Sequence, residues 1–255
     1  MKVTNWRRKL SATLVAVGLI SPSAVYSAGL NVNLVTNGGF ENVDLTTVGA
    51  YNSPRVLDWT GPSLFAYSHD GSSSSCGGAN CVVPNYADGA PPPGGGHWYF
   101  TPNNAGALLD VHEPGVYFQD IDVSTGATAT AIAAGTATFN LSAFMASYLN
   151  DADSANVNAE FRNAGSTPIG SATLTDNDVG PNNVWNLNSL SGSVPVGTTS
   201  VRLSLYGISS DPTRGGDGYM DNVDFRINGV PEPSSIGLIG MGLAAAAGIA
   251  RRRKD

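Results

Sequence analysis

The side chains with the most evident chemistry are two cysteines, Cys76 and Cys81, the only ones in a chain of 255 residues. They flank Gly77-Gly78-Ala79-Asn80 in a serine-rich stretch without regular periodicity. Two thiols without histidine ligands at a matching spacing make a poor zinc site. In an oxidising compartment we expect them to form a disulfide, and closing so short a ring would contribute roughly 2 kcal/mol. Two free thiols are the alternative.

Acid–base catalysis has little support in the sequence. The glutamates of the folded part share no catalytic motif, the histidines do not follow the H-E-x-x-H spacing, and there is no G-x-S-x-G elbow. The glutamates are Glu41, Glu113 and Glu160, and the histidines are His69, His97 and His112. We therefore expect no catalytic residue and no enzyme. Spatial pairing of two carboxylates, which a glycoside hydrolase would need, is the alternative.

Aromatic side chains near a polar loop could bind sugars. An exposed ring can stack on the C–H face of a sugar, while Asn, Asp and Arg bond its hydroxyl groups. Trp98 and Tyr86 lie in or beside the polar stretch His69–Gly96 and are the favoured carbohydrate-binding residues. If the strand at His97–Thr101 alternates, however, either Trp98 or Tyr99 points into the core.

The elements that would position these side chains are short strands. Apolar and polar residues alternate in Val201–Tyr206, and Tyr219–Ile227 places Val223, Phe225 and Ile227 on one face. Further strand-like segments are Val116–Val123, Ala137–Tyr148, Val157–Arg162, Ser171–Thr175 and Val184–Leu190. Because no convincing amphipathic helix interrupts them, the pattern predicts an all-β fold, an antiparallel two-sheet β-sandwich over residues 29–229.

The sequence also predicts the main loops and bends of this sandwich. Residues 69–96 form a long loop, which in a compact domain is usually functional or mobile. Asn33–Asn37 is expected to be the first strand, and the following Asn37-Gly38-Gly39 requires a positive φ that turns Phe40 inward. Two acidic segments, Asp151–Asn156 and Asp176–Asp178, do not match a calcium loop and are expected to be solvated turns.

Composition limits the class of partner. The formal net charge is -7 and only 13% of the residues are charged, which is common in exported β-proteins. The basic residues outside the last few positions form no stripe, so the sequence argues against nucleic acid as a partner.

The amino terminus is typical of export. Lys2, Arg7, Arg8 and Lys9 precede the apolar segment Ser11–Ile20, and Val25-Tyr26-Ser27 offers small residues for cleavage. Residues 1–28 are therefore predicted to be a secretory signal peptide.

The carboxy terminus has three parts in a fixed order: Val230-Pro231-Glu232-Pro233, the apolar run Ile236–Ala250, and Arg251-Arg252-Arg253-Lys254. Prolines keep the first part out of a helix. A transmembrane helix over about residues 234–250 would span roughly 25 Å, slightly less than the hydrocarbon core of about 30 Å. The basic end would stay on the cytoplasmic side, so the rest of the chain faces outward.

This order resembles the PEP-CTERM sorting signal of exported bacterial proteins, over residues 230–255. The resemblance implies processing near Val230, Pro231, Glu232 and Pro233 by an exosortase-type membrane protease, followed by release or attachment at the cell surface. An ordinary membrane anchor is the alternative.

A second resemblance covers Asn33–Ile227. The opening Asn33–Glu41, Trp59 downstream and the closing Tyr219–Phe225 resemble the galactose-binding-like jelly rolls, including carbohydrate-binding modules. The resemblance implies that the first and last strands lie side by side. It also implies a structural Ca²⁺ with Glu41 and Asp221 as carboxylate ligands and backbone carbonyls completing the shell. Alternatively, both carboxylates bond backbone N–H groups at turns.

Together these observations predict an exported, surface-sorted, non-catalytic β-sandwich that binds extracellular or envelope polysaccharide. It would work in the cell envelope, at the surface or in the extracellular matrix. The alternatives are a structural or adhesive matrix protein without sugar affinity and a glycoside hydrolase.

Overall fold

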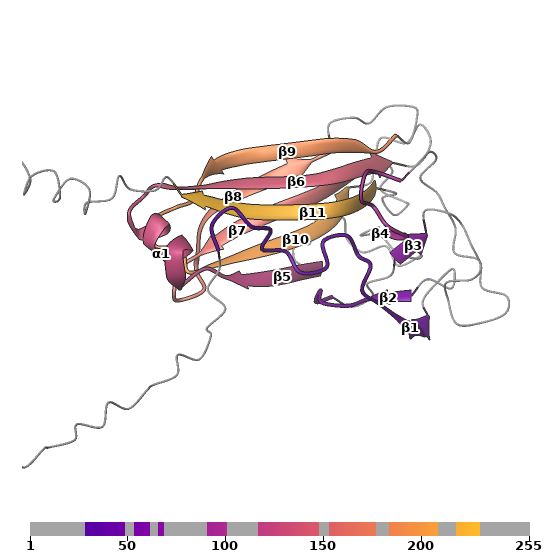
Figure 1. Cartoon of the computed structure of the whole chain (residues 1–255), viewed down its shortest axis with the longest axis horizontal. Helices are drawn as coiled ribbons and strands as arrows, with labels where there is room; N and C mark the ends of the chain where they lie inside the picture. The colour runs from indigo at the N-terminus through magenta and orange to yellow at the C-terminus, as the bar shows by residue number, and fades with distance from the viewer. Residues whose placement is uncertain are drawn as a thin grey trace, which may run out of the picture.

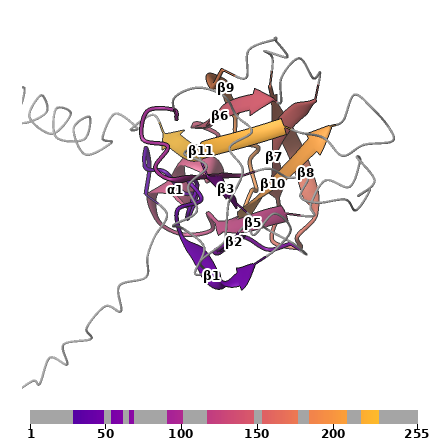
Figure 2. The same cartoon turned by 90° about the vertical axis from the view of Figure 1, so that its right-hand side faces the viewer.

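Two antiparallel sheets packed face to face form the body of the protein (Figures 1 and 2). The structure is a computed structural model and describes residues 29–48, 54–61, 66–68, 91–100, 117–147, 153–176, 184–208 and 218–229. The predicted all-β, two-sheet sandwich is therefore confirmed.

The five-stranded sheet has the order β3-β4-β11-β6-β9, and the four-stranded sheet the order β5-β10-β7-β8. The strands of the first are β3 (Ala66–Ser68), β4 (Trp98–Phe100), β11 (Gly218–Gly229), β6 (Ala137–Ser147) and β9 (Asn186–Ser193). Those of the second are β5 (Tyr117–Asp122), β10 (Ser200–Ile208), β7 (Ser154–Arg162) and β8 (Pro168–Thr175). A separate pair, β1 (Val43–Val48) and β2 (Pro54–Val56), lies beside them.

The core lies between the sheets, where the alternation expected from the sequence is present. Val201, Leu203 and Leu205 of β10 are fully buried, and so are Phe225 and Ile227 of β11. Rings from both layers meet, because Phe161 of β7 contacts Phe139 of β6 at 5.2 Å between centroids. Burying each such side chain contributes roughly 1.5–3 kcal/mol, so these inward faces hold the sheets together.

The first segment of the domain lies alongside the last strand, as predicted, but it is not a strand. Leu34 N donates to Phe225 O at 2.8 Å, and Val223 N donates to Gly38 O at 2.8 Å. The backbone turns before the first bond at Asn31, with a φ of 62°, and between the two bonds at Asn37, with a φ of 52°. An extended ladder cannot continue through such residues, so the strand assigned to Asn33–Asn37 was wrong.

Two further expectations are corrected. The helix α1 (Gly126–Ala133) was not foreseen, because its alternating alanines and threonines carry no amphipathic pattern. The acids Asp153 and Asp176 are not in solvated turns, since 1% and 4% of their surfaces are exposed. Asp176 N donates to Ala155 O, so the β7–β8 pairing continues one residue past β8.

Several predicted features lie outside the described residues. These are the signal peptide at 1–28, Cys76, Cys81, Tyr86 and the carboxy-terminal segment 230–255 with its predicted span. Within the part of the chain that the structure describes, no helix has the length and apolar character needed to cross a membrane.

Candidate functional site

The bend after the first segment rests directly on β11. Gly38 packs against the carbonyl of Val223 so closely that a Cβ atom at this position would collide with it. Asn37 and Phe40 carry the positive φ values that the sequence led us to expect near the glycines. Phe40 is fully buried and stacks on Phe100 of β4, with 5.1 Å between ring centroids. The bend therefore turns Phe40 into the core and places Glu41 next to β11.

A bulge in β11 brings Asp221 to the same place. The β6–β11 register shifts between Asp221 and Asp224, and Asn222 within the bulge has a φ of 49°. The Asp221 side chain is fully buried. Burial and, to a lesser extent, the negative charge of Glu41 raise the pKa of its carboxyl to about 9, although the hydrogen bond from Asn222 N acts to lower it. The predicted convergence of Glu41 and Asp221 is thus present, and we call these two side chains with Asn222 the acidic corner.

The glycine segment Gly94-Gly95-Gly96 also packs against the acidic corner. A Cβ atom on Gly95 would lie 2.6 Å from Asp221 Oδ2, and one on Gly96 would collide with the Glu41 carboxylate. Gly94 and Gly96 both have positive φ, at 77° and 61°. Only glycine allows this approach together with this backbone conformation.

Hydrogen bonds in the acidic corner also support the alternative role of the two acids. Glu41 Oε1 accepts bonds from His97 N at 2.8 Å and from Trp98 N at 2.7 Å. Asp221 Oδ1 accepts a bond from Asn222 N at 2.6 Å. Both carboxylates therefore fix backbone N–H groups.

The donor set of the acidic corner fits a hard cation in part. Asn222 Oδ1 lies 3.1 Å from the Cβ position of Gly39, which is itself close to both carboxylates. Among the described residues no group of three or more Asp, Glu, His or Cys side chains converges. A calcium ion would therefore need backbone carbonyls and the Asn222 amide oxygen besides Glu41 and Asp221. Asn222 was missed from the sequence, although it directly follows Asp221.

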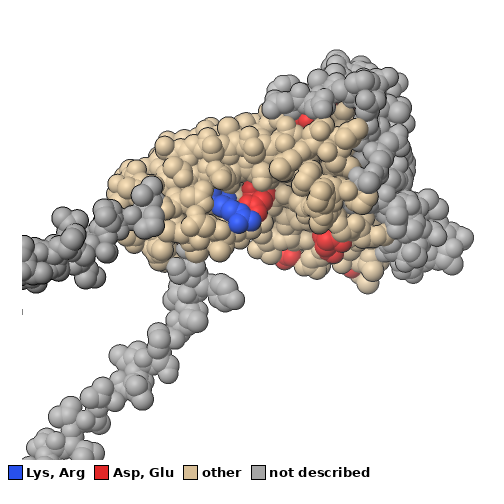
Figure 3. All heavy atoms as spheres, turned by 45° about the horizontal axis from the view of Figure 1, so that its top comes forward, with Lys and Arg blue, Asp and Glu red and all other residues tan. Residues whose placement is uncertain are grey.

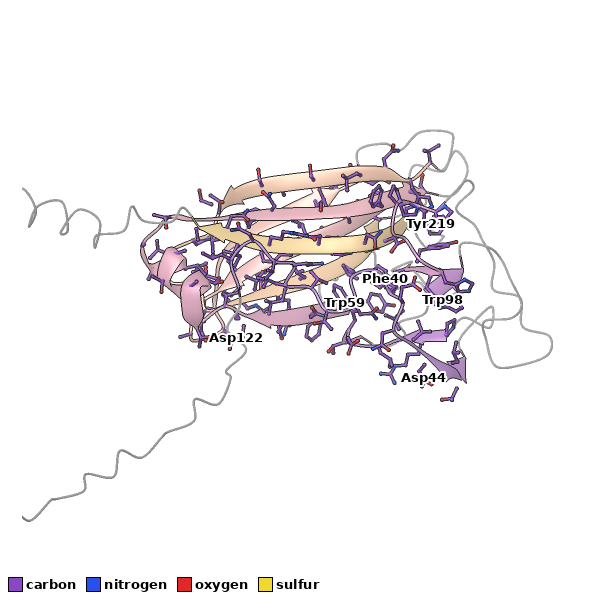
Figure 4. All side chains as sticks on the ribbon, in the orientation of Figure 1. Phe40, Asp44, Trp59, Trp98, Asp122 and Tyr219 are labelled. Carbon is purple, nitrogen blue, oxygen red and sulfur yellow. The ribbon has the colours of Figure 1, made fainter. Side chains whose placement is uncertain are left out.

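The predicted sugar platform Trp98 is buried. Only 5% of its surface is exposed, and Tyr99 beside it is fully buried. Figure 4 shows Trp98 at the same end of the sandwich as Phe40 and Trp59. A ring stacks on a sugar only when its face is open, so burial argues against this role for Trp98. Tyr86 lies outside the described residues.

The outer face of the four-stranded sheet carries a polar array that sequence reasoning missed. Arg202 on β10 donates to both carboxylate oxygens of Asp120 on β5, at 2.7 and 2.6 Å, and lies 3.7 Å from the ring centroid of Phe118. Asn158 on β7 donates to the Thr173 hydroxyl on β8 at 2.9 Å. Tyr206 is half-buried at the end of β10, paired in register with Asn156. We call this surface the four-strand face.

Asn156 on the four-strand face is fully buried, yet its Oδ1 has no hydrogen-bond partner among the described residues. Its Nδ2 group donates to Ser154 at 3.2 Å. Leaving a buried acceptor unpaired costs roughly 1–3 kcal/mol. Because none of the Asn156 surface is exposed, a ligand in solution does not reach this oxygen.

A shallow pocket of about 360 Å³ adjoins the four-strand face at the edge of β5. It is lined by Leu34, Thr36, Asp58, Gln119, Asp120, Ile121 and Asp122. Its carboxylates already have partners, since Asn42 bonds Asp58 and the Ser124 N–H bonds Asp122. The hydrogen bond from the Ser124 hydroxyl and, to a lesser degree, the one from its N–H lower the pKa of Asp122.

Comparison with protein families matches residues 229–254 to the PEP-CTERM protein-sorting motif. The chain carries a PEP-CTERM sorting motif. The match covers the predicted Pro-Glu-Pro segment, the apolar run and the basic block, and it indicates an exported protein sorted to the cell envelope. No curated protein matches the sequence.

Solved structures resemble the sandwich distantly. The CBM22-1 and GH10 modules of Clostridium thermocellum xylanase 10B, complexed with xylohexaose, align at 9% identity and a TM-score of 0.42 over 78% of this chain and 29% of that one. TmCBM61 in complex with β-1,4-galactotriose aligns at 11% identity and a TM-score of 0.39, over 78% and 99% of the two chains. A Stig cyclase from Fischerella sp. TAU aligns at 12% identity and 0.43, over 79% and 100%. The chain spans less than a third of the xylanase, and likenesses this distant assign no activity.

Proposed function

We propose that this is an exported, surface-sorted and non-catalytic protein that binds extracellular or envelope polysaccharide through its four-strand face. Its sorting motif would be processed by an exosortase-type membrane protease near Val230–Pro233. The acidic corner would hold a structural calcium ion that fixes the bend at Phe40 to β11.

The observation that carries the binding proposal is the polar array on the four-strand face, where half-buried Asn158 donates to the hydroxyl of exposed Thr173. Sugar hydroxyls can bond such amide and hydroxyl groups, whereas the fully buried Asn156 is out of their reach. Neighbouring Asn158 and half-buried Tyr206 supply an amide and an aromatic ring at adjacent register positions. Amide groups next to an aromatic ring are a common combination in sugar recognition.

The same face argues against glycoside hydrolysis. A general acid of that reaction needs a raised pKa. Here the hydrogen bond from Arg202 lowers the pKa of Asp120, and Glu160 is ion-paired with Arg162. A panel of chromogenic glycosides tests this part, and turnover that disappears in Glu160→Gln would favour the hydrolase instead.

A glycan array with residues 29–229 tests the binding proposal. We expect signals for one polysaccharide class, weakened about tenfold by Tyr206→Ala and by Asn158→Ala. Leu187→Ala is the matched control, because Leu187 is 61% exposed and belongs to the other sheet. The proposal is wrong if the control weakens binding as much as the two variants do.

The alternative is a structural or adhesive matrix protein without sugar affinity. It is favoured by the outward side of β9 and β6, where Ser189, Ser191 and Ser193 oppose Ser142, Asn140 and Thr138 in an uncharged array. This role would be supported if no glycan on the array gives a signal and the same protein self-associates.

A further inference from the structure

The end of the sandwich that carries α1 is built from four segments that meet there. These are residues 29–32, 123–136, 163–167 and 194–199, and β11 ends among them (Figures 1 and 2). The contacts are close: the Cβ position of Gly229 lies 3.0 Å from both Ala131 of α1 and Leu30. Thr199 N donates to Arg162 O, and Val123 N donates to Thr199 O. We call these four segments the α1 end.

The four segments of the α1 end contain no charged residue, although the protein as a whole is acidic. Among the charged residues at their border is the exposed Asp122 of β5, whose carboxylate accepts a bond from Ser124 N. Val196 in the last segment is 63% exposed and Val32 in the first is 48% exposed. Figure 3 shows only uncharged residues on the visible part of this end. By contrast, the acidic corner with Glu41 and Asp221 lies toward the other end of β11.

The path of the chain ties the α1 end to the sorting motif. β11 ends at Gly229, and the PEP-CTERM match begins at the same residue. Only residues 230–235 separate Gly229 from the apolar run Ile236–Ala250 that the sequence predicts to enter the membrane. Six residues reach at most about 22 Å when fully extended. An anchored chain therefore cannot carry the sandwich far from the bilayer surface.

We propose that the α1 end is a contact surface for the lipid headgroups, on which the sandwich stands while its carboxy-terminal segment is anchored. The inference rests on the sorting part of the proposed function and on the predicted transmembrane helix that anchors the chain before processing. Anionic lipids repel carboxylates and do not repel uncharged residues, so this end, with Asp122 at its border, is repelled less than the acidic corner and faces the bilayer. Asp221 lies eight residues before Gly229 in β11, so the acidic corner would stand about 26 Å above this surface.

The test uses the full chain, from which the native cysteines have been removed by Cys76→Ser and Cys81→Ser. One fluorophore is attached at Val196→Cys and, in a second protein, at Leu187→Cys. Leu187 is the matched control because it is 61% exposed and lies near the opposite end of the sandwich, where β9 begins. Both proteins are reconstituted into vesicles of phosphatidylethanolamine and phosphatidylglycerol that contain a headgroup-spin-labelled lipid.

We expect the label at position 196 to be quenched at least about threefold more strongly than the label at 187. Adding Ala133→Asp and Ala134→Asp at the exposed end of α1 should reduce this difference on anionic vesicles and leave it unchanged on vesicles of neutral lipid, because only anionic headgroups repel the new carboxylates. Circular dichroism verifies that each variant is folded.

Flotation of the vesicles distinguishes a wrong contact surface from a missing membrane anchor. If the chain floats with the vesicles but both labels are quenched equally, the contact surface is wrong and the anchor stands. If the chain does not float, the anchoring step itself fails, and the inference fails with it.

Discussion

At the scale of single residues, the acidic corner is dominated by one buried carboxyl group. Asp221 is fully buried next to Glu41, and its pKa is raised from 3.8 to about 9. Two carboxylates this close repel one another in a medium of low dielectric constant, so the corner favours either a proton or a cation. Occupancy of this corner should therefore control the stability of the fold.

We predict that the metal-free protein becomes less stable as the pH rises. Between about pH 4 and pH 9 the folded state retains a proton on Asp221 that the unfolded state releases, so the free energy of unfolding falls by up to about 1.4 kcal/mol per pH unit. Urea melts in a chelator near pH 5 and pH 8 measure this slope. Asp221→Asn should flatten it.

We also predict that calcium restores the stability at pH 8. Ca²⁺ binds the ionised carboxylates, so millimolar CaCl₂ should raise the melting temperature in the wild type and have a smaller effect in Glu41→Gln. If the wild type melts at the same temperature with calcium and with chelator at pH 8, the acidic corner does not bind calcium.

At the scale of elements, the bend at residues 37–41 fixes the start of the domain to β11. The bend needs the absence of a Cβ at Gly38, because the carbonyl of Val223 occupies that space. The same contact holds Phe40 in the core and Glu41 in the acidic corner. Stability and the candidate metal site therefore depend on one small backbone contact.

We predict that Gly38→Ala destabilises the protein by more than about 2 kcal/mol, because the backbone of β11 cannot move away without breaking the β6–β11 ladder. Gly165→Ala is the control, since its new Cβ would lie 3.3 Å from the Asn163 side chain and meet no backbone atom. Chemical denaturation compares the two, and similar small losses in both would contradict this prediction.

The loop between β3 and β4 carries the predicted disulfide, outside the described residues. If Cys76 and Cys81 are bridged, the non-reduced protein should resist alkylation and weigh two hydrogen atoms less than the reduced form. Mass spectrometry before and after reduction decides this, and two alkylated thiols in the untreated protein would exclude the bridge.

At the scale of the whole molecule, the acidic corner is set apart from the sorting motif. The acidic corner lies several residues from the end of β11, whereas Gly229 joins the motif at the uncharged α1 end. A sandwich oriented in this way presents its loops and its four-strand face to the surroundings of the cell. This arrangement suits a protein that binds a matrix component while it is held near the membrane.

We predict that the sorting motif is processed in a host with an exosortase-type protease. Replacing Pro231, Glu232 and Pro233 by alanine should leave the chain full length in the membrane fraction, because the protease would lose its recognition segment. The intact mass of the surface-released wild type should correspond to a carboxy terminus near Val230–Pro233. Release of the triple variant with the same mass would contradict this prediction.

The sequence by itself determined the features that are encoded locally. Alternation in Val201–Tyr206 and Tyr219–Ile227 fixed which side chains enter the core, and the order of the last residues identified the sorting motif. The helix α1 escaped prediction because its alanines and threonines lack a periodic apolar face. The start of the domain was misjudged because positive φ at Asn31 and Asn37 breaks the extended chain.

Only the tertiary structure decided what depends on distant segments. The sequence alone does not show that the ring of Trp98 is buried, that Asp153 and Asp176 are excluded from water, or that Asn156 keeps an unpaired oxygen. Each of these properties arises from neighbours supplied by other strands. Likewise, the α1 end is uncharged only because four separate segments, each unremarkable in sequence, are brought together by the pairing of the sheets.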